Sequence, residues 1–113
     1  MENNYTFKAK CIGGTDGDTA DFTIDIGFKL TTTQRLRFIN IDCPERGQPN
    51  YREAKEFVEE KILGKMCRVV THKSDSFGRY LADVHYLDIE ADEWKPLSQA
   101  LLDAGLAVEY RGD

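Results

Sequence analysis

Three segments in the first half of the chain alternate apolar and polar residues with a period of two. They cover residues 5–12, 19–28 and 34–41, and turns rich in glycine, aspartate or threonine separate them. In the second segment Phe22, Ile24 and Ile26 fall on one face. Such alternation predicts strands with one buried face, and short turns between them predict antiparallel pairing. The chain is therefore constrained to begin as a sheet, with a bulge expected at Gly27.

A helical pattern begins only after this predicted sheet. Asn50 with Glu53 three residues later predicts a capped helix start, and Gly64 predicts its end. The later elements are strands at 66–71 and 79–87, an acidic connector at 88–93, and a helix from Pro96 to Gly105. We therefore expect an α+β, mainly β, fold: a five-stranded OB-fold barrel with one helix between strands 3 and 4 and a second near the C-terminus. At this length we expect one domain over residues 1–113.

Charge and cysteine content narrow the range of functions. A net charge of −5 argues against a broad basic surface for duplex nucleic acid. Cys11, Cys43 and Cys67 are odd in number and widely spaced, so neither a disulfide framework nor a zinc site is predicted, and an intracellular setting is favoured. We expect no membrane association, because no apolar run reaches spanning length and the first residues do not resemble a signal peptide.

The segment from Arg37 to Glu45 concentrates groups that suit phosphate chemistry. Arg37 falls on the face opposite its apolar neighbours, and Asp42 follows at the predicted strand end. Pro44 forces Cys43 into an extended conformation, which leaves the Cys43 carbonyl free of a strand ladder. Carboxylate and carbonyl oxygens beside a planar guanidinium suit a hard metal ion working on a phosphate.

Two other clusters accompany this segment. Asp16-Gly17-Asp18-Thr19 precedes the second predicted strand, and Asp75-Ser76-Phe77-Gly78-Arg79 precedes the fifth. Each alone is typical of a solvated turn. In their order and spacing, the three clusters together resemble the staphylococcal-nuclease-like (thermonuclease) family over nearly the whole chain.

This resemblance implies an OB-fold nuclease that uses Ca²⁺, with Mg²⁺ as an alternative. It would hydrolyse phosphodiester bonds of DNA and RNA, preferably single-stranded or frayed, to 3′-phosphate products. The resemblance implies that Asp18, Asp42 and the Cys43 backbone carbonyl hold the metal. We expect the protein to act as a monomer.

The resemblance also assigns three catalytic residues. Glu45 would deprotonate the attacking water, while Arg37 and Arg79 would bind the phosphate. The chain departs from the family where a Lys-Tyr pair is common, because Ser76 and Phe77 stand there. It also carries Cys43 where the family often has threonine, a change that leaves the backbone carbonyl available.

Some alternatives stay open at the level of sequence. Tyr110 fits a base-stacking role or a packing role, and DNA or RNA could be the preferred substrate. The sequence ends at Asp113, before the family's usual third helix. A catalytically silent nuclease-like OB module that binds nucleic acid or protein is the second hypothesis. A purely structural OB domain would leave the three clusters without a common purpose.

Overall fold

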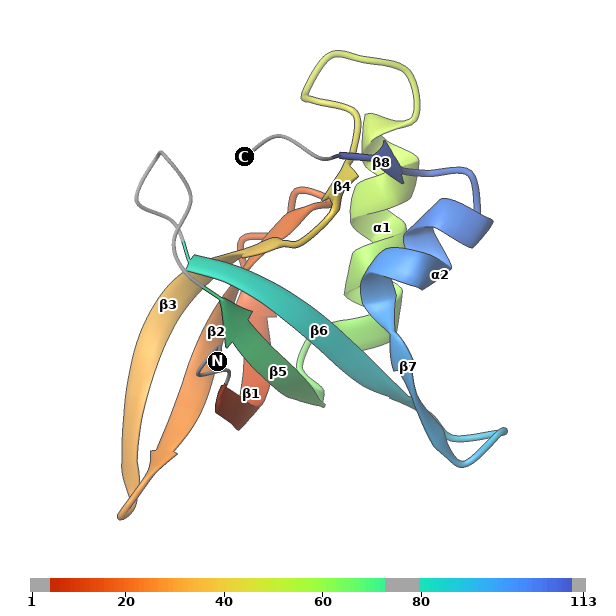
Figure 1. The fold of residues 1–113 in the computed structure, drawn as a ribbon. Coiled ribbons are helices and arrows are strands. Elements are labelled where there is room, and N and C mark those ends of the chain that lie inside the picture. Colours follow the sequence, from red (N-terminus) through yellow and green to blue (C-terminus); the bar gives the residue numbers. More distant parts are fainter. Residues whose placement is uncertain (1–4, 73–79, 111–113) are drawn as a thin grey trace.

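A computed structural model describes residues 5–72 and 80–110, which form a closed barrel with two helices beside it (Figure 1). The barrel strands are β1 (Tyr5–Gly13), β2 (Thr19–Gly27), β3 (Leu30–Phe38), β5 (Met66–His72) and β6 (Tyr80–Asp88). Adjacent strands in the order β3-β2-β1-β5-β6 pair antiparallel, and a parallel pairing of β3 with β6 closes the barrel. The predicted five-stranded OB-fold barrel is confirmed.

Both predicted helices are present and contact each other on one side of the barrel (Figure 1). Helix α1 (Tyr51–Ile62) buries Ala54, Val58 and Ile62, which lie four residues apart along one helical face. Helix α2 (Leu97–Asp103) buries Leu97 and Leu101 in the same way. Within residues 5–72 and 80–110, no helix is both long and apolar enough to cross a membrane.

The hydrophobic core fills the barrel and the space beneath the helices. Its members are the inward-facing residues of the strands and the buried faces of α1 and α2. The largest fully buried side chains are Phe22, Phe38, Leu36, Ile41, Ile62, Leu97 and Leu101. Phe22 and Ile24 on the predicted core face of β2 are buried, so the alternation identifies the buried side over most of that strand. Ile26 was predicted on the same face but is exposed, because it lies at the end of β2 next to the bulge.

The observed strands differ from the sequence prediction in three places. The segment 34–41 was expected as one strand, but β3 ends at Phe38 and Ile41 belongs to a separate short strand. Strand β3 begins at Leu30 and not at residue 34, because the threonines expected to form a connector pair in register with β2. Their branched side chains suit a pleated strand. The acidic segment 88–93 was predicted as a connector, but it is the tight turn of a hairpin between β6 and β7 (Glu93–Pro96). The bulge expected at Gly27 is confirmed by a register shift after Asp25.

Two further elements complete the fold. Strands β4 (Ile41–Asp42) and β8 (Val108–Glu109) pair antiparallel as a small separate sheet.

At the start of α1, Asn50 occupies the predicted N-cap position but makes no side-chain capping bond, and its φ is +70°. The left-handed backbone differs from the extended conformation of a side-chain cap, so the predicted capping box is wrong although the helix start is correct.

The buried thiols make stability sensitive to alkaline pH. Burial raises the pKa of Cys67 from 9.0 to about 12, and it also raises the pKa of Cys11. A raised pKa in the folded state gives stability that is fully present below pH 9 and is lost as pH rises toward 12. For Cys67 the expected loss in unfolding free energy is about 1.4 kcal/mol at about pH 10.

Urea unfolding of the parent and of Cys67→Ala at neutral and alkaline pH measures this effect. The variant is less stable at neutral pH because it leaves a cavity, but its stability should decline less with pH. Parallel declines for the two proteins would contradict the assignment of this alkaline sensitivity to Cys67.

Candidate functional site

The pairing of β2 with β3 places the first predicted site residues next to each other. Thr19 pairs with Arg37, so Asp18, one residue earlier, lies beside the end of β3. Leu36 and Phe38 point into the core, whereas the Arg37 side chain emerges on the opposite face. The Arg37 residue is nevertheless only 8% exposed.

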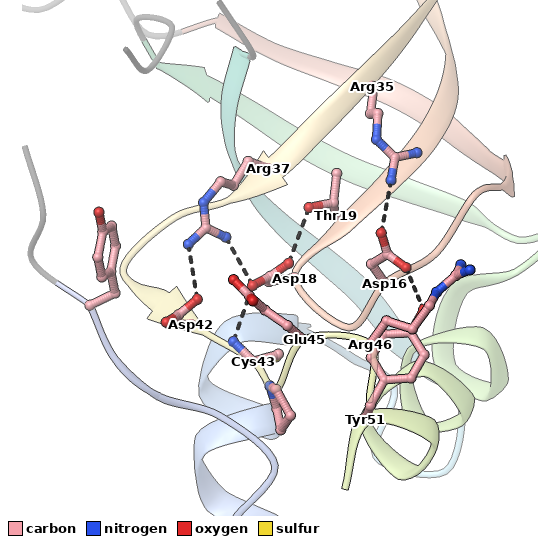
Figure 2. Close-up of a pocket in the computed structure, with 12 residues that line it drawn as sticks. Asp16, Asp18, Thr19, Arg35, Arg37, Asp42, Cys43, Glu45, Arg46 and Tyr51 are labelled. Atoms are coloured by element: carbon pink, nitrogen blue, oxygen red, sulfur yellow. Dashed lines mark hydrogen bonds and ion pairs between the residues drawn. The ribbon is translucent and has the colours of Figure 1, made fainter. Parts of the chain in front are cut away.

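Arg37 contacts both of the acidic residues predicted to hold a metal (Figure 2). Its Nη1 lies 3.2 Å from Asp18 Oδ2, and its Nη2 lies 3.6 Å from Asp42 Oδ1. Nη2 also donates a hydrogen bond of 3.0 Å to the carbonyl of Ile41. Nη1 is buried, and within the described part of the chain it makes no hydrogen bond in spite of the short ion pair. The guanidinium therefore holds two carboxylates and keeps a donor available.

The Asp18 carboxylate is held from its other side by the chain leaving β4. The Cys43 amide donates to Asp18 Oδ2 at 3.1 Å, and the Thr19 hydroxyl donates to Oδ1 at 3.1 Å. No backbone amide of residues 5–72 or 80–110 donates to the Cys43 carbonyl. Gly17 allows this approach, because a Cβ there would lie 3.1 Å from the Cys43 Cβ and its φ is +75°.

The Cys43 thiol is unreactive at neutral pH. Burial raises its pKa to about 12, and the nearby Asp18 and Asp42 carboxylates raise it further than Arg37 lowers it. The thiol stays protonated at neutral pH, so it is not a nucleophile there. What Cys43 presents to the site is its backbone.

Glu45 and Tyr110 complete the group of predicted residues. Gln48 Oε1 accepts a hydrogen bond of 2.7 Å from the Glu45 amide, which fixes the loop that carries the Glu45 side chain. The Tyr110 ring lies 5.3 Å from the Arg37 guanidinium carbon, in cation–π geometry. One pocket of about 430 Å³ is lined by the predicted residues Asp18, Arg37, Asp42, Cys43, Glu45 and Tyr110. Arg79, the remaining predicted catalytic residue, lies outside the described residues.

The pocket also contains residues to which the sequence analysis gave no role. They are Asp16, Arg35, Arg46 and Tyr51. Arg35 had a signal in the sequence, because it lies two residues before Arg37 and so shares its face of the strand. It forms ion pairs of 3.2 Å with Asp16 and 3.0 Å with Asp21 (Figure 2 draws the first). Tyr51 had no comparable signal, since its contact depends on how α1 docks.

The acidic side chains are arranged as a pair and not as a larger cluster. Within residues 5–72 and 80–110, no three His, Cys, Asp or Glu side chains gather closely enough to hold a metal ion. Asp18 and Asp42 converge on one arginine, and the Cys43 carbonyl belongs to the backbone between Asp42 and Pro44. The groups here that could contact a cation are two carboxylates and one carbonyl oxygen.

These features define an OB-fold barrel domain with an arginine–carboxylate pocket at the exit of β3. The model of the staphylococcal nuclease homologue family matches residues 35–113, and the chain belongs to this family. The resemblance inferred from the sequence motifs is thus confirmed.

Several curated proteins are similar to this chain. A probable endonuclease of Schizosaccharomyces pombe is 36% identical over 87 residues, which cover 71% of this chain and 38% of that protein. Probable endonuclease LCL3 of Saccharomyces cerevisiae is 39% identical over 90 residues, with coverage of 74% and 32%. An endonuclease of Saprolegnia parasitica is 31% identical over 127 aligned positions, with coverage of 98% and 59%. The chain spans about a third of the length of the first two relatives.

Proposed function

We propose that this chain is a metal-dependent nuclease domain that hydrolyses phosphodiester bonds of DNA and RNA to 3′-phosphate products. One observation carries the proposal: Arg37, Asp18, Asp42 and Glu45 line the same pocket, with the guanidinium between two carboxylates. The names of the relatives, which describe endonucleases, support the same reaction class. The roles of the individual pocket residues are part of the same proposal.

The donor set fits a hard divalent cation. The pocket is lined by four carboxylates (Asp16, Asp18, Asp42 and Glu45) and three guanidinium groups (Arg35, Arg37 and Arg46). One net negative charge remains, so the pocket favours an additional cation. Ca²⁺ takes roughly six to eight oxygen ligands, and two carboxylates and a carbonyl leave positions for water and a phosphate oxygen. Mg²⁺ binds through one or two carboxylates plus substrate phosphates and remains an alternative. When bound, the cation would polarise the phosphate and lower the pKa of a coordinated water.

In this proposal Arg37 binds the phosphate that is cleaved. Arg37 lines the pocket, and its planar guanidinium can donate charge-assisted hydrogen bonds to phosphate oxygens. Because Ile41 and the two aspartates fix the guanidinium, it needs little reorganisation as negative charge grows on the phosphate. Arg79 would supply a second guanidinium, a role that its motif supports.

Glu45 is proposed to deprotonate the attacking water. The carboxylate lies in the pocket, and no ion pair links it to another side chain in the described part of the chain. Its backbone is anchored by Gln48, so the carboxylate is presented from a fixed loop. A carboxylate held close to the phosphate site suits general base catalysis.

The surroundings of the pocket favour single-stranded or frayed nucleic acid. Tyr110 is 41% exposed next to Arg37, and an aromatic ring in that place can stack on an unpaired base. The net charge of −5 offers few phosphate contacts beyond the pocket, which disfavours tight binding of a duplex. We propose that the domain acts as a monomer.

The deciding experiment is digestion of plasmid DNA, a single-stranded oligonucleotide and RNA in Ca²⁺, Mg²⁺ or excess chelator. We expect cleavage with metal, none with chelator, and products that end in 3′-phosphate. Retained nucleic-acid binding without cleavage in either metal would contradict the proposal and favour the silent OB module.

Calcium should also raise the thermal stability of the protein. A ligand that binds only the folded state stabilises by about 2.7 kcal/mol at a concentration 100 times its Kd, which corresponds to a rise of several degrees in Tm. Asp18→Asn should lose this calcium-dependent rise. Asp92→Asn is a matched control, because Asp92 lies in an exposed turn with φ +53° that asparagine tolerates. An unchanged melt of the parent in millimolar Ca²⁺ would contradict the metal site.

A further inference from the structure

We propose that Tyr51 is a positioning residue that orients Asp16 and thereby fixes the turn that presents Asp18. The catalytic consequence of this inference rests on the proposed function. Tyr51 is the first residue of α1, and Asp16 belongs to the turn between β1 and β2. Figure 2 shows Asp16 between Tyr51 on one side and Arg35 on the other.

The carboxylate of Asp16 is bound at both oxygens. The Tyr51 hydroxyl donates to Oδ1 at 2.6 Å, a length typical of a strong hydrogen bond to a charged acceptor. Arg35 Nη2 lies 3.2 Å from Oδ2. One contact comes from the helix and the other from the barrel, so together they set the orientation of the carboxylate.

The backbone of Asp16 transmits this orientation to Asp18. The Asp16 amide donates to the Thr19 carbonyl at 2.9 Å, and the Asp18 amide donates to the Asp16 carbonyl at 2.7 Å. Asp18 in turn accepts from the Cys43 amide and pairs with Arg37. Rotation of Asp16 would therefore shift a carboxylate in the centre of the site.

Tyr51 is also tied to the loop that carries Glu45. Its amide donates to the Gln48 carbonyl at 3.3 Å, and Gln48 exchanges hydrogen bonds with Glu45 through its amide and its side chain. A single residue thus connects the turn of Asp18 with the loop of Glu45. Groups that hydrogen-bond a metal ligand typically contribute about 10- to 100-fold in metal affinity or activity. Tyr51 lies one contact further from the proposed ligands, so we expect an effect at the low end of this range.

The Tyr51 hydroxyl is not required to attach α1 to this turn. Thr15, one residue before Asp16, donates to the Glu59 carboxylate on the same helix at 3.0 Å. Gly17, one residue after, packs so closely that an added Cβ would lie 3.2 Å from the Ala54 Cβ. The turn is therefore anchored on both sides of Asp16, and the specific contribution of the hydroxyl is to orient the carboxylate.

This difference provides a matched pair of variants. Tyr51→Phe removes the hydrogen bond to Asp16, whereas Thr15→Val removes the neighbouring bond between the same turn and the same helix. We expect Tyr51→Phe to weaken Ca²⁺ binding about 10-fold and to lower kcat with little change in KM. Thr15→Val should lower Tm but keep the parental Ca²⁺ affinity and kcat.

Two measurements test whether Tyr51 acts on Ca²⁺ binding through Asp16 and the turn that carries Asp18. In Tyr51→Phe without metal or substrate, the amides of Asp18 and Cys43 should exchange hydrogen faster than in Thr15→Val. In the Asp16→Asn background, Tyr51→Phe should have much less effect on Ca²⁺ affinity, because contacting residues that act together are not additive. Equal behaviour of Tyr51→Phe and Thr15→Val in these readouts would overturn the inference, as would an undiminished effect in the Asp16→Asn background.

The hydrogen-exchange readout separates this inference from the proposed function. If the parent neither binds Ca²⁺ nor cleaves, but Tyr51→Phe still accelerates exchange at Asp18 and Cys43, the positioning role stands and the nuclease proposal fails. If the parent cleaves and exchange at both amides is unchanged in Tyr51→Phe, the nuclease proposal stands and the positioning role fails.

Discussion

Glu45→Gln is expected to reduce the single-turnover cleavage rate by about 100- to 10,000-fold, the range that general base catalysis contributes. Glutamine keeps the shape of the side chain but cannot accept a proton from water. The anchoring bond from the Glu45 backbone amide to Gln48 does not involve the carboxylate, so the loop should keep its conformation. Ca²⁺ affinity and oligonucleotide binding should remain close to those of the parent.

The measurement is single-turnover cleavage of a short labelled oligonucleotide, with calcium titration of the same protein preparations. Glu53→Gln makes the same chemical change on the exposed surface of α1 and should cleave like the parent. If Glu45→Gln cleaves at the parental rate, another group activates the water and the role given to Glu45 is wrong.

Arg37→Lys is expected to lower kcat by about 100- to 1,000-fold, the usual effect of removing one donor from a growing negative charge. The guanidinium reaches the Ile41 carbonyl and both aspartates from two nitrogens, whereas an ammonium group is a single point charge. The loss should fall mainly on kcat, because the interaction strengthens in the transition state.

Arg52→Lys on the exposed surface of α1 is the matched control for this substitution. Because Arg37 is buried, the thermal melt of Arg37→Lys must be recorded, and cleavage must be compared at temperatures where both proteins are folded. A kcat near the parental value, or a loss seen only in KM, would contradict a role for Arg37 in the transition state.

The barrel could be predicted from the sequence because each of its main strands carries its own pattern of alternating apolar and polar residues. Alternation in the first half of the chain and the apolar face of α1 mark the buried sides directly. The hairpin of β6 and β7 was missed because its short second strand offers no alternation long enough to recognise. The Asn50 cap failed because residue type predicts the position of a helix start but not the backbone angle there.

The site was predictable only where a motif spans it. Asp18, Asp42 and Glu45 lie in short patterns, and the structure places all three around one pocket. Arg35 could have been found, because it lies two residues before Arg37 on the same face of β3. Tyr51 reaches the pocket through the docking of α1, which no single segment of sequence encodes.

The parallel pairing of β3 with β6 determines when the site can form during folding. Arg37 pairs with Leu81 there, although strands, a loop and α1 separate the two residues along the chain. Contacts between such distant segments are slow to form during folding, because the intervening chain must first be ordered. A nascent chain that has emerged only as far as Glu45 already contains the acidic residues, but not the strand that closes the barrel beside Arg37. We therefore expect the proposed activity only after β6 has paired with β3 and closed the barrel.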